Sequence, residues 1–183
     1  MPRVALTTFA LMKQPYDHPD MAEFEENISV MFQGAEAAPG FITRARPVDD
    51  LDDVSNFDRD WGVWGTFAVP RSYTLGRTYN TDQRASTLSL WVDLPTAFEY
   101  SYNGVHRHAL NRRHAWMLPW ADASYALWWV GDEEIPTWTD ACARLDHLTD
   151  HGSTPHAFDF RHPFDAEDRP IPAIRPQRSE ASA

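Results

Sequence analysis

Alternation between hydrophobic and polar positions predicts four β-strands along the chain. Residues 4–12 and 85–92 alternate most regularly, and the shorter runs 41–46 and 125–130 are also rich in strand-forming residues. Because successive side chains of a strand point to opposite faces of its sheet, alternation indicates that each strand turns an apolar side toward a core. In 85–92, for example, Trp91 and Leu90 are expected on opposite faces.

Three segments carry hydrophobic residues at helical spacing instead. The first covers residues 21–35, and the third covers residues 136–151. The second, 94–117, follows Asp93, a residue type that favours the N-terminal cap of a helix. We expect one continuous helix over 94–117, with a weak point at Gly104.

The order strand, helix, strand occurs twice and is followed by the third helix. Two such β-α-β units predict an α+β domain of the ferredoxin-like type, an antiparallel sheet with helices on one face. The sequence predicts this domain over residues 1–165 and a mobile, proline-containing C-terminal tail over 166–183. The other face of the sheet is expected to be bare, and pairing two such faces predicts a homodimer, a dimeric α+β barrel.

Composition excludes several classes of partner. The net charge of −11 repels a phosphate backbone, so we expect no nucleic acid. No stretch approaches the roughly 20 apolar residues that span a bilayer, so we expect no membrane partner. A single cysteine, Cys142, excludes an internal disulfide and, with no recognisable signal peptide, predicts a cytoplasmic protein.

Eight tryptophans are the unusual feature of the composition. Aromatic side chains at this density either fill a core or line a pocket for a flat apolar ligand. We expect most of them to fill the core. Trp64 and Trp91 are the two that we expect to wall a pocket.

The helix predicted over 94–117 holds the candidate chemistry. On one continuous helix His106 faces the apolar interior, Tyr102 lies one turn before it, and Arg113 lies two turns after it. The simplest interpretation of His106 is a hydrogen-bonded core residue. Two functional interpretations stay open: an axial ligand to haem iron, with Arg113 meeting a propionate, or a general base for an apolar substrate that carries a carboxylate.

The residues around this helix also carry a resemblance. The residues that carry the resemblance are Ser89 to Leu94, Phe98, Tyr100, Tyr102 to His106, Arg112-Arg113 and Trp116. The chain resembles an uncharacterised bacterial family of the dimeric α+β-barrel superfamily over most of residues 3–165. The resemblance implies a pocket between the sheet and its helices. The superfamily includes cofactor-free monooxygenases and haem enzymes. The stretch ending at His106 is also similar to spheroidene monooxygenase, a haem-linked oxygenase.

We therefore expect a haem-binding, oxygenase-like enzyme that acts on an apolar or aromatic small molecule. His106 would hold the iron, and Arg113, Trp64 and Trp91 would complete the haem site, with His106, Tyr102 and Arg113 as catalytic residues. One alternative is a cofactor-free monooxygenase or cyclase that uses His106 or Tyr102 as its acid or base. The other is a non-catalytic protein that binds a small molecule on its aromatic side chains.

Overall fold

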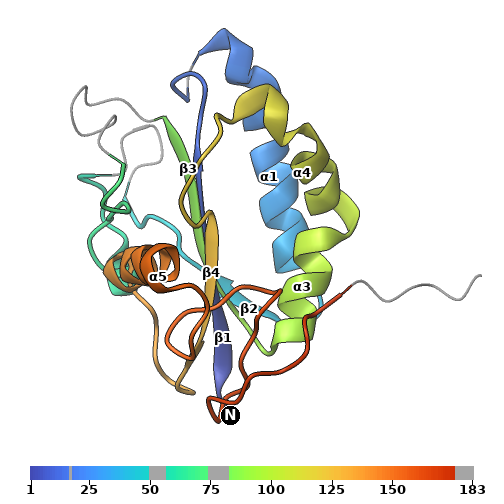
Figure 1. Cartoon of the computed structure of the whole chain (residues 1–183). Coiled ribbons are helices and arrows are strands. Elements are labelled where there is room, and N and C mark those ends of the chain that lie inside the picture. Colours follow the sequence, from blue (N-terminus) through green and yellow to red (C-terminus); the bar gives the residue numbers. More distant parts are fainter. Residues whose placement is uncertain (17, 50–56, 74–82, 176–183) are drawn as a thin grey trace, which may run out of the picture.

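A four-stranded antiparallel sheet forms the centre of the molecule. The computed structural model describes residues 1–16, 18–49, 57–73 and 83–175 (Figure 1). The sheet has the strand order β2-β3-β1-β4, and every neighbouring pair is antiparallel. This is the order that two β-α-β units give in a ferredoxin-like fold, so the predicted α+β class is confirmed. The strands are β1 (Arg3–Leu11), β2 (Phe41–Arg44), β3 (Arg84–Trp91) and β4 (Tyr125–Val130).

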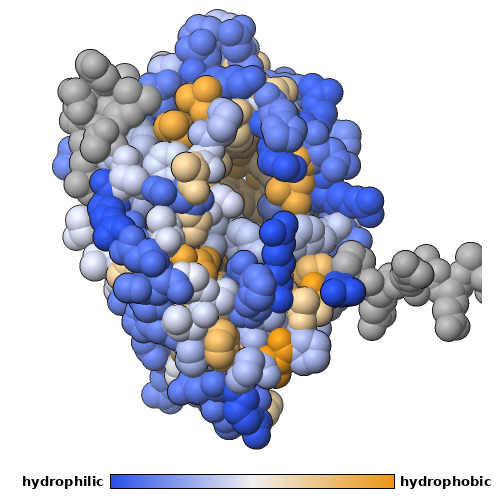
Figure 2. All heavy atoms as spheres, in the orientation of Figure 1, coloured by the Kyte–Doolittle hydropathy of each residue, from blue (hydrophilic) through white to orange (hydrophobic). Residues whose placement is uncertain are grey.

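The helices of the two β-α-β units lie on one face of this sheet. They are α1 (Ala22–Glu36), α3 (Leu94–Tyr102) and α4 (Gly104–Trp116), grouped on one side in Figure 1. A short 3-10 turn, η1 (Pro19–Met21), precedes α1. Figure 2 shows a hollow near the middle of this view, with both apolar and polar side chains at its margin. The helices therefore do not cover the strands completely.

The predicted continuous helix over residues 94–117 is wrong. Asn103 adopts an extended conformation, with φ −127° and ψ 176°, and ends α3. Gly104 follows with φ +53°, a left-handed conformation that other residues rarely adopt, and α4 starts from there. The chain therefore changes direction between Tyr102 and His106. The shared helical face on which the sequence places these two side chains does not exist.

The other face of the sheet is not bare, as the sequence analysis expected, but covered by the chain itself. The helix α5 (Trp138–His151) packs there together with residues 61–73, which include a 3-10 turn, η2 (Gly62–Trp64). A capping box fixes the start of α5: the Thr137 side chain accepts a hydrogen bond from the Asp140 backbone N–H, and the Asp140 carboxylate accepts one from the Thr137 N–H. The argument that led to a homodimer therefore no longer holds, and the homodimer stays a prediction.

The segment after α5 folds along the edge of the sheet beside β4. Leu127 of β4 and Phe158 exchange two backbone hydrogen bonds, of 2.8 and 2.9 Å. Further on, the Ile174 backbone N–H donates to the Phe160 carbonyl at 3.0 Å. The chain therefore contacts the sheet-bearing part of the molecule as far as Ile174. The boundary at residue 165 stays a prediction. The rest of the predicted tail lies outside the described residues.

Candidate functional site

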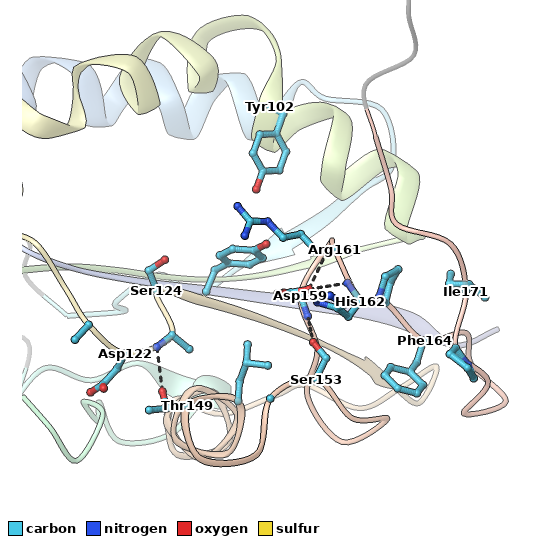
Figure 3. A pocket seen from close by; sticks show the side chains of 17 residues that line it. Tyr102, Asp122, Ser124, Thr149, Ser153, Asp159, Arg161, His162, Phe164 and Ile171 are labelled. Carbon is cyan, nitrogen blue, oxygen red and sulfur yellow. Dashed lines mark hydrogen bonds and ion pairs between the residues drawn. The ribbon is translucent and has the colours of Figure 1, made fainter.

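A cavity of about 940 Å³ lies at the edge of the sheet, beside the start of β4. Its walls come from four places that are far apart in the sequence: the last residue of α3, the loop that precedes β4, the C-terminal end of α5, and residues 152–171 (Figure 3). The segment that follows α5 is held beside β4 by backbone hydrogen bonds between Leu127 and Phe158. The antiparallel pairing of Leu127 with Phe158 therefore positions the cavity.

Aromatic rings form one side of this cavity. Tyr125 starts β4 and, by the alternation of the strand, faces the same side as Leu127 and the helical layer. Its ring stacks on Phe160, with centroids 5.7 Å apart and an angle of 29° between the planes. Tyr102 meets the same Phe160 ring edge-on, at 5.8 Å. The two tyrosines therefore reach the cavity from different elements and meet at one phenylalanine.

The Tyr102 hydroxyl lies close enough to the Tyr125 hydroxyl to raise the pKa of Tyr125. The Tyr125 hydroxyl accepts a hydrogen bond from the Phe160 backbone N–H, at 3.4 Å. Burial raises the pKa of the Tyr125 phenol well above its usual value, and the neighbouring Tyr102 and the nearby carboxylate of Asp159 raise it further. Tyr125 is therefore neutral across the physiological pH range and keeps its hydroxyl proton.

A positive charge faces this pair of hydroxyls. Figure 3 shows the Arg161 side chain extending into the cavity, with the Tyr102 hydroxyl pointing toward its guanidinium. Asp159 shapes the turn that presents Arg161: its Oδ1 accepts hydrogen bonds from the backbone N–H groups of Arg161, at 2.9 Å, and His162, at 2.7 Å. The same oxygen lies 3.2 Å from His162 Nδ1. Asp159 therefore uses this oxygen to hold the turn.

His106 lies away from this cavity, in the angle between the helices. Its Nδ1 is 2.8 Å from the Ser101 carbonyl, and its ring lies beside Tyr100, with centroids 5.1 Å apart. Burial lowers the pKa of His106, so the neutral imidazole is favoured, and Nδ1–H then donates to Ser101. His106 is not among the residues that line the cavity. His106 is therefore a partly buried histidine whose ring is held by a hydrogen bond.

The other residues predicted for a haem site do not gather around His106. Arg113 is exposed and turns its guanidinium back to the Leu110 carbonyl, at 2.9 Å. Trp64 and Trp91 are both buried, but they belong to hydrophobic clusters on opposite faces of the sheet. Of the predicted site residues only Tyr102 lines the cavity. The predicted residues therefore do not fit one haem site, and haem stays a prediction from the sequence.

Sequence reasoning missed most of the residues that form the cavity. The sequence pattern places Tyr125 in a strand without a further role. Arg161 and Asp159 lie just before the expected tail, in a segment without periodicity. The alternation of β4 does place Tyr125 on one face, so this residue could have been identified. The Arg161 position depends on the path of the chain after α5, for which local pattern carries no signal.

The described residues contain neither a metal-binding cluster nor a helix that could span a membrane. No group of three or more histidine, cysteine, aspartate or glutamate side chains in this part of the chain is arranged to hold a metal ion. Similarly, none of the helices in the described ranges combines the length and the apolar character needed to cross a membrane.

Comparison with known proteins gives a family and a weak structural likeness. A family model described as "Domain of unknown function (DUF3291)" matches residues 3–173. No curated protein matches the chain. Among solved structures, PA3566 from Pseudomonas aeruginosa is similar, with a TM-score of 0.40 and 9% sequence identity over 73% of this chain and 97% of that one. A likeness at this level carries no argument about function.

Proposed function

Because the chain belongs to the DUF3291 family, whose description assigns no function, we propose a function from the cavity itself: this protein binds a small organic molecule with a planar apolar body. The molecule would lie beside β4, between the end of α3 and the segment that follows α5. A non-catalytic binding protein was one of the alternatives that the sequence left open.

The size and the walls of the cavity support this proposal. Its volume of about 940 Å³ falls within the range of about 300–1,000 Å³ that is usual for small-molecule sites. Tyr125 and Phe160, which stack on each other, and Tyr102 provide aromatic surface to which a flat molecule can pack. Packed side chains do not fill this space, so the aromatic surface is open to a ligand.

The observation that carries the proposal is the pair of tyrosine hydroxyls. A phenol with a purely structural role would direct its hydroxyl into the protein rather than toward an open space. Here the Tyr102 hydroxyl points into the cavity, toward Arg161 (Figure 3), while the raised pKa of Tyr125 keeps its proton in place. Polar groups that converge on an otherwise aromatic cavity fix the orientation of a ligand.

The same two hydroxyls favour a second candidate, a cofactor-free acid-base enzyme. Neutral phenols that point at one position can donate hydrogen bonds to an oxygen that becomes negative during a reaction. Tyr102, which the sequence identified as a possible acid or base, would be the group nearest to such an oxygen. Conversion of a bound ligand by the natural protein and loss of that conversion in Tyr102→Phe, followed by mass spectrometry, would distinguish an enzyme from a binding protein.

The proposal is tested by filling the cavity. Ser124 lines the cavity and is exposed, so a Ser124→Trp side chain can enter the space without displacing the core. We expect isothermal titration calorimetry to detect binding of a neutral planar probe, 2-naphthamide, to the natural protein. Ser124→Trp should weaken this binding by about tenfold or more, because the indole occupies the volume that the naphthalene needs.

A matched variant controls for the added tryptophan. Ser72 is exposed and does not line the cavity, so Ser72→Trp should bind 2-naphthamide as the natural protein does. Equal weakening in both variants, or no binding of the probe to the natural protein, would contradict the proposal. The other sequence-based expectations, a homodimer of the dimeric α+β-barrel superfamily in the cytoplasm, stay predictions that these titrations do not address.

A further inference from the structure

The cavity proposed above as a binding site also contains a cation whose charge no carboxylate in the described ranges neutralises directly. Arg161 makes no ion pair there, whereas Arg169 is paired with Asp165 at 2.8 Å and Arg44 with Glu36 at 2.9 Å. The chain has 27 acidic against 16 basic residues, so acidic partners are abundant in its composition. A guanidinium left to face a cavity in such a chain is available to a ligand.

The two carboxylates that line the cavity in the described part of the chain, those of Asp159 and Asp122, do not form an ion pair with Arg161. Asp159 Oδ1 accepts hydrogen bonds from two backbone N–H groups of its own turn and lies beside His162, and this arrangement holds the backbone of Arg161 rather than its side chain. Asp122 also lines the cavity, but Figure 3 shows its carboxylate pointing away from Arg161. The acidic residues therefore shape the site without neutralising the guanidinium through an ion pair.

The donors that remain match one chemical group. A guanidinium offers two parallel N–H donors in a plane, which fit the two oxygens of a carboxylate. The Tyr102 hydroxyl points at the same place from the opposite wall (Figure 3) and can donate a third hydrogen bond. Among the described residues that line the cavity, Arg161 is the one arginine or lysine, and Asp122 and Asp159 add negative charge there. This balance favours a singly charged group over a phosphate dianion.

We infer that the ligand of this cavity is a planar aromatic carboxylate, whose ring packs against Tyr125 and Phe160 and whose carboxylate binds Arg161 and the Tyr102 hydroxyl. This inference rests on the proposed function and adds the class of ligand to it. It concerns recognition alone and includes no bond-making step. Arg161 is exposed to solvent. A planar molecule without a negative group would therefore still fit the aromatic wall and leave the guanidinium hydrated, but it would not form the charge-assisted hydrogen bonds.

A pair of probes of the same shape tests the charge separately from the shape. The natural protein should bind 2-naphthoate about tenfold more tightly than 2-naphthamide, as measured by isothermal titration calorimetry at low salt, because hydrogen bonds to charged groups are the stronger ones. Arg161→Gln should remove this preference and leave the affinity for the amide within about twofold. Arg112→Gln, which changes an exposed arginine that pairs with Glu23 on the helical layer, should keep the preference.

The outcomes separate this inference from the proposed function. If both probes bind equally well to the natural protein, or if Arg161→Gln retains the preference, the carboxylate inference is wrong and the binding cavity stands. If neither probe binds, both are wrong. A preference that disappears in Arg161→Gln and in Arg112→Gln alike would reflect the overall charge of the protein and would also overturn the assignment to Arg161.

Discussion

Two regions of this molecule are rich in aromatic side chains, and they are built in opposite ways. On the face of the sheet that α5 covers, Trp138 is 4.9 Å from Trp61 and 4.8 Å from Phe67, measured between ring centroids, and all three are buried. At the edge of the sheet, Tyr102 and Tyr125 border an open cavity of about 940 Å³. The first region is a packed core, and the second is an open cavity bordered by aromatic side chains.

This difference shows what aromatic density does and does not indicate. Tryptophans such as Trp64, which the sequence analysis placed in a pocket, are buried in the packed region. The cavity instead contains tyrosines and an arginine, whose polar ends need hydrogen-bond partners or open space. Polar ends that converge, rather than the number of rings, therefore distinguish a candidate site from a core.

The largest expected effect comes from the packed region. Trp138→Ala removes a side chain that is 2% exposed and in contact with two other rings. We expect the free energy of unfolding, measured by urea denaturation, to fall by about 3–5 kcal/mol, as large-to-small changes of this size do in a core. A loss below about 1 kcal/mol would show that this face is loosely packed and would remove the contrast between the two regions.

In the cavity we expect a substitution to change ligand affinity more than the free energy of unfolding. Tyr102→Phe keeps the ring that meets Phe160 and removes only the hydroxyl, so its unfolding free energy should change by less than about 1 kcal/mol. The affinity for 2-naphthoate should fall several-fold, because one hydrogen bond to the carboxylate is lost. A variant that loses stability but binds the probe normally would assign the hydroxyl to the structure and not to the site.

The smallest effect concerns the histidine that sequence analysis favoured. Burial lowers the pKa of His106 in the folded protein below its ordinary value of 6.5. The folded state therefore binds fewer protons than the unfolded state, and the contribution of His106 to stability is present above pH 6.5 and is lost as the pH falls through that value toward the lower folded pKa.

Urea denaturation at several pH values measures this contribution. A His106→Asn variant, which cannot titrate there, should lose less stability between pH 7 and pH 5 than the natural protein. His147 and His156, whose pKa values are also lowered by burial, remain in both proteins and cancel in the comparison. An identical pH dependence in the two proteins would contradict the lowered pKa of His106.

Local sequence pattern predicted the elements of the fold better than their arrangement. The alternation in residues 125–130 matches β4, and the Asp93 cap matches the start of α3, where its carboxylate accepts a hydrogen bond from the Thr96 N–H. Both features depend on neighbouring residues alone. The antiparallel class followed from the order of these elements, because two β-α-β units have few ways to pack.

The predicted arrangement is wrong where a single residue or a long-range contact determines the path of the chain. Gly104 was identified as a weak point, but spacing alone does not reveal that it adopts φ +53° and separates Tyr102 from His106. The placement of α5 on the second face and the turn that presents Arg161 depend on long-range packing with β4. Of the residues predicted for the site, only Tyr102 therefore lines the cavity.

A crystal structure of the protein with 2-naphthoate tests the central claim most directly, because it locates the ligand. We expect electron density for the naphthalene beside Tyr125 and Phe160, with the carboxylate within hydrogen-bond distance of the Arg161 guanidinium and the Tyr102 hydroxyl. Density for the probe elsewhere on the molecule, with this cavity filled by solvent alone, would contradict the account.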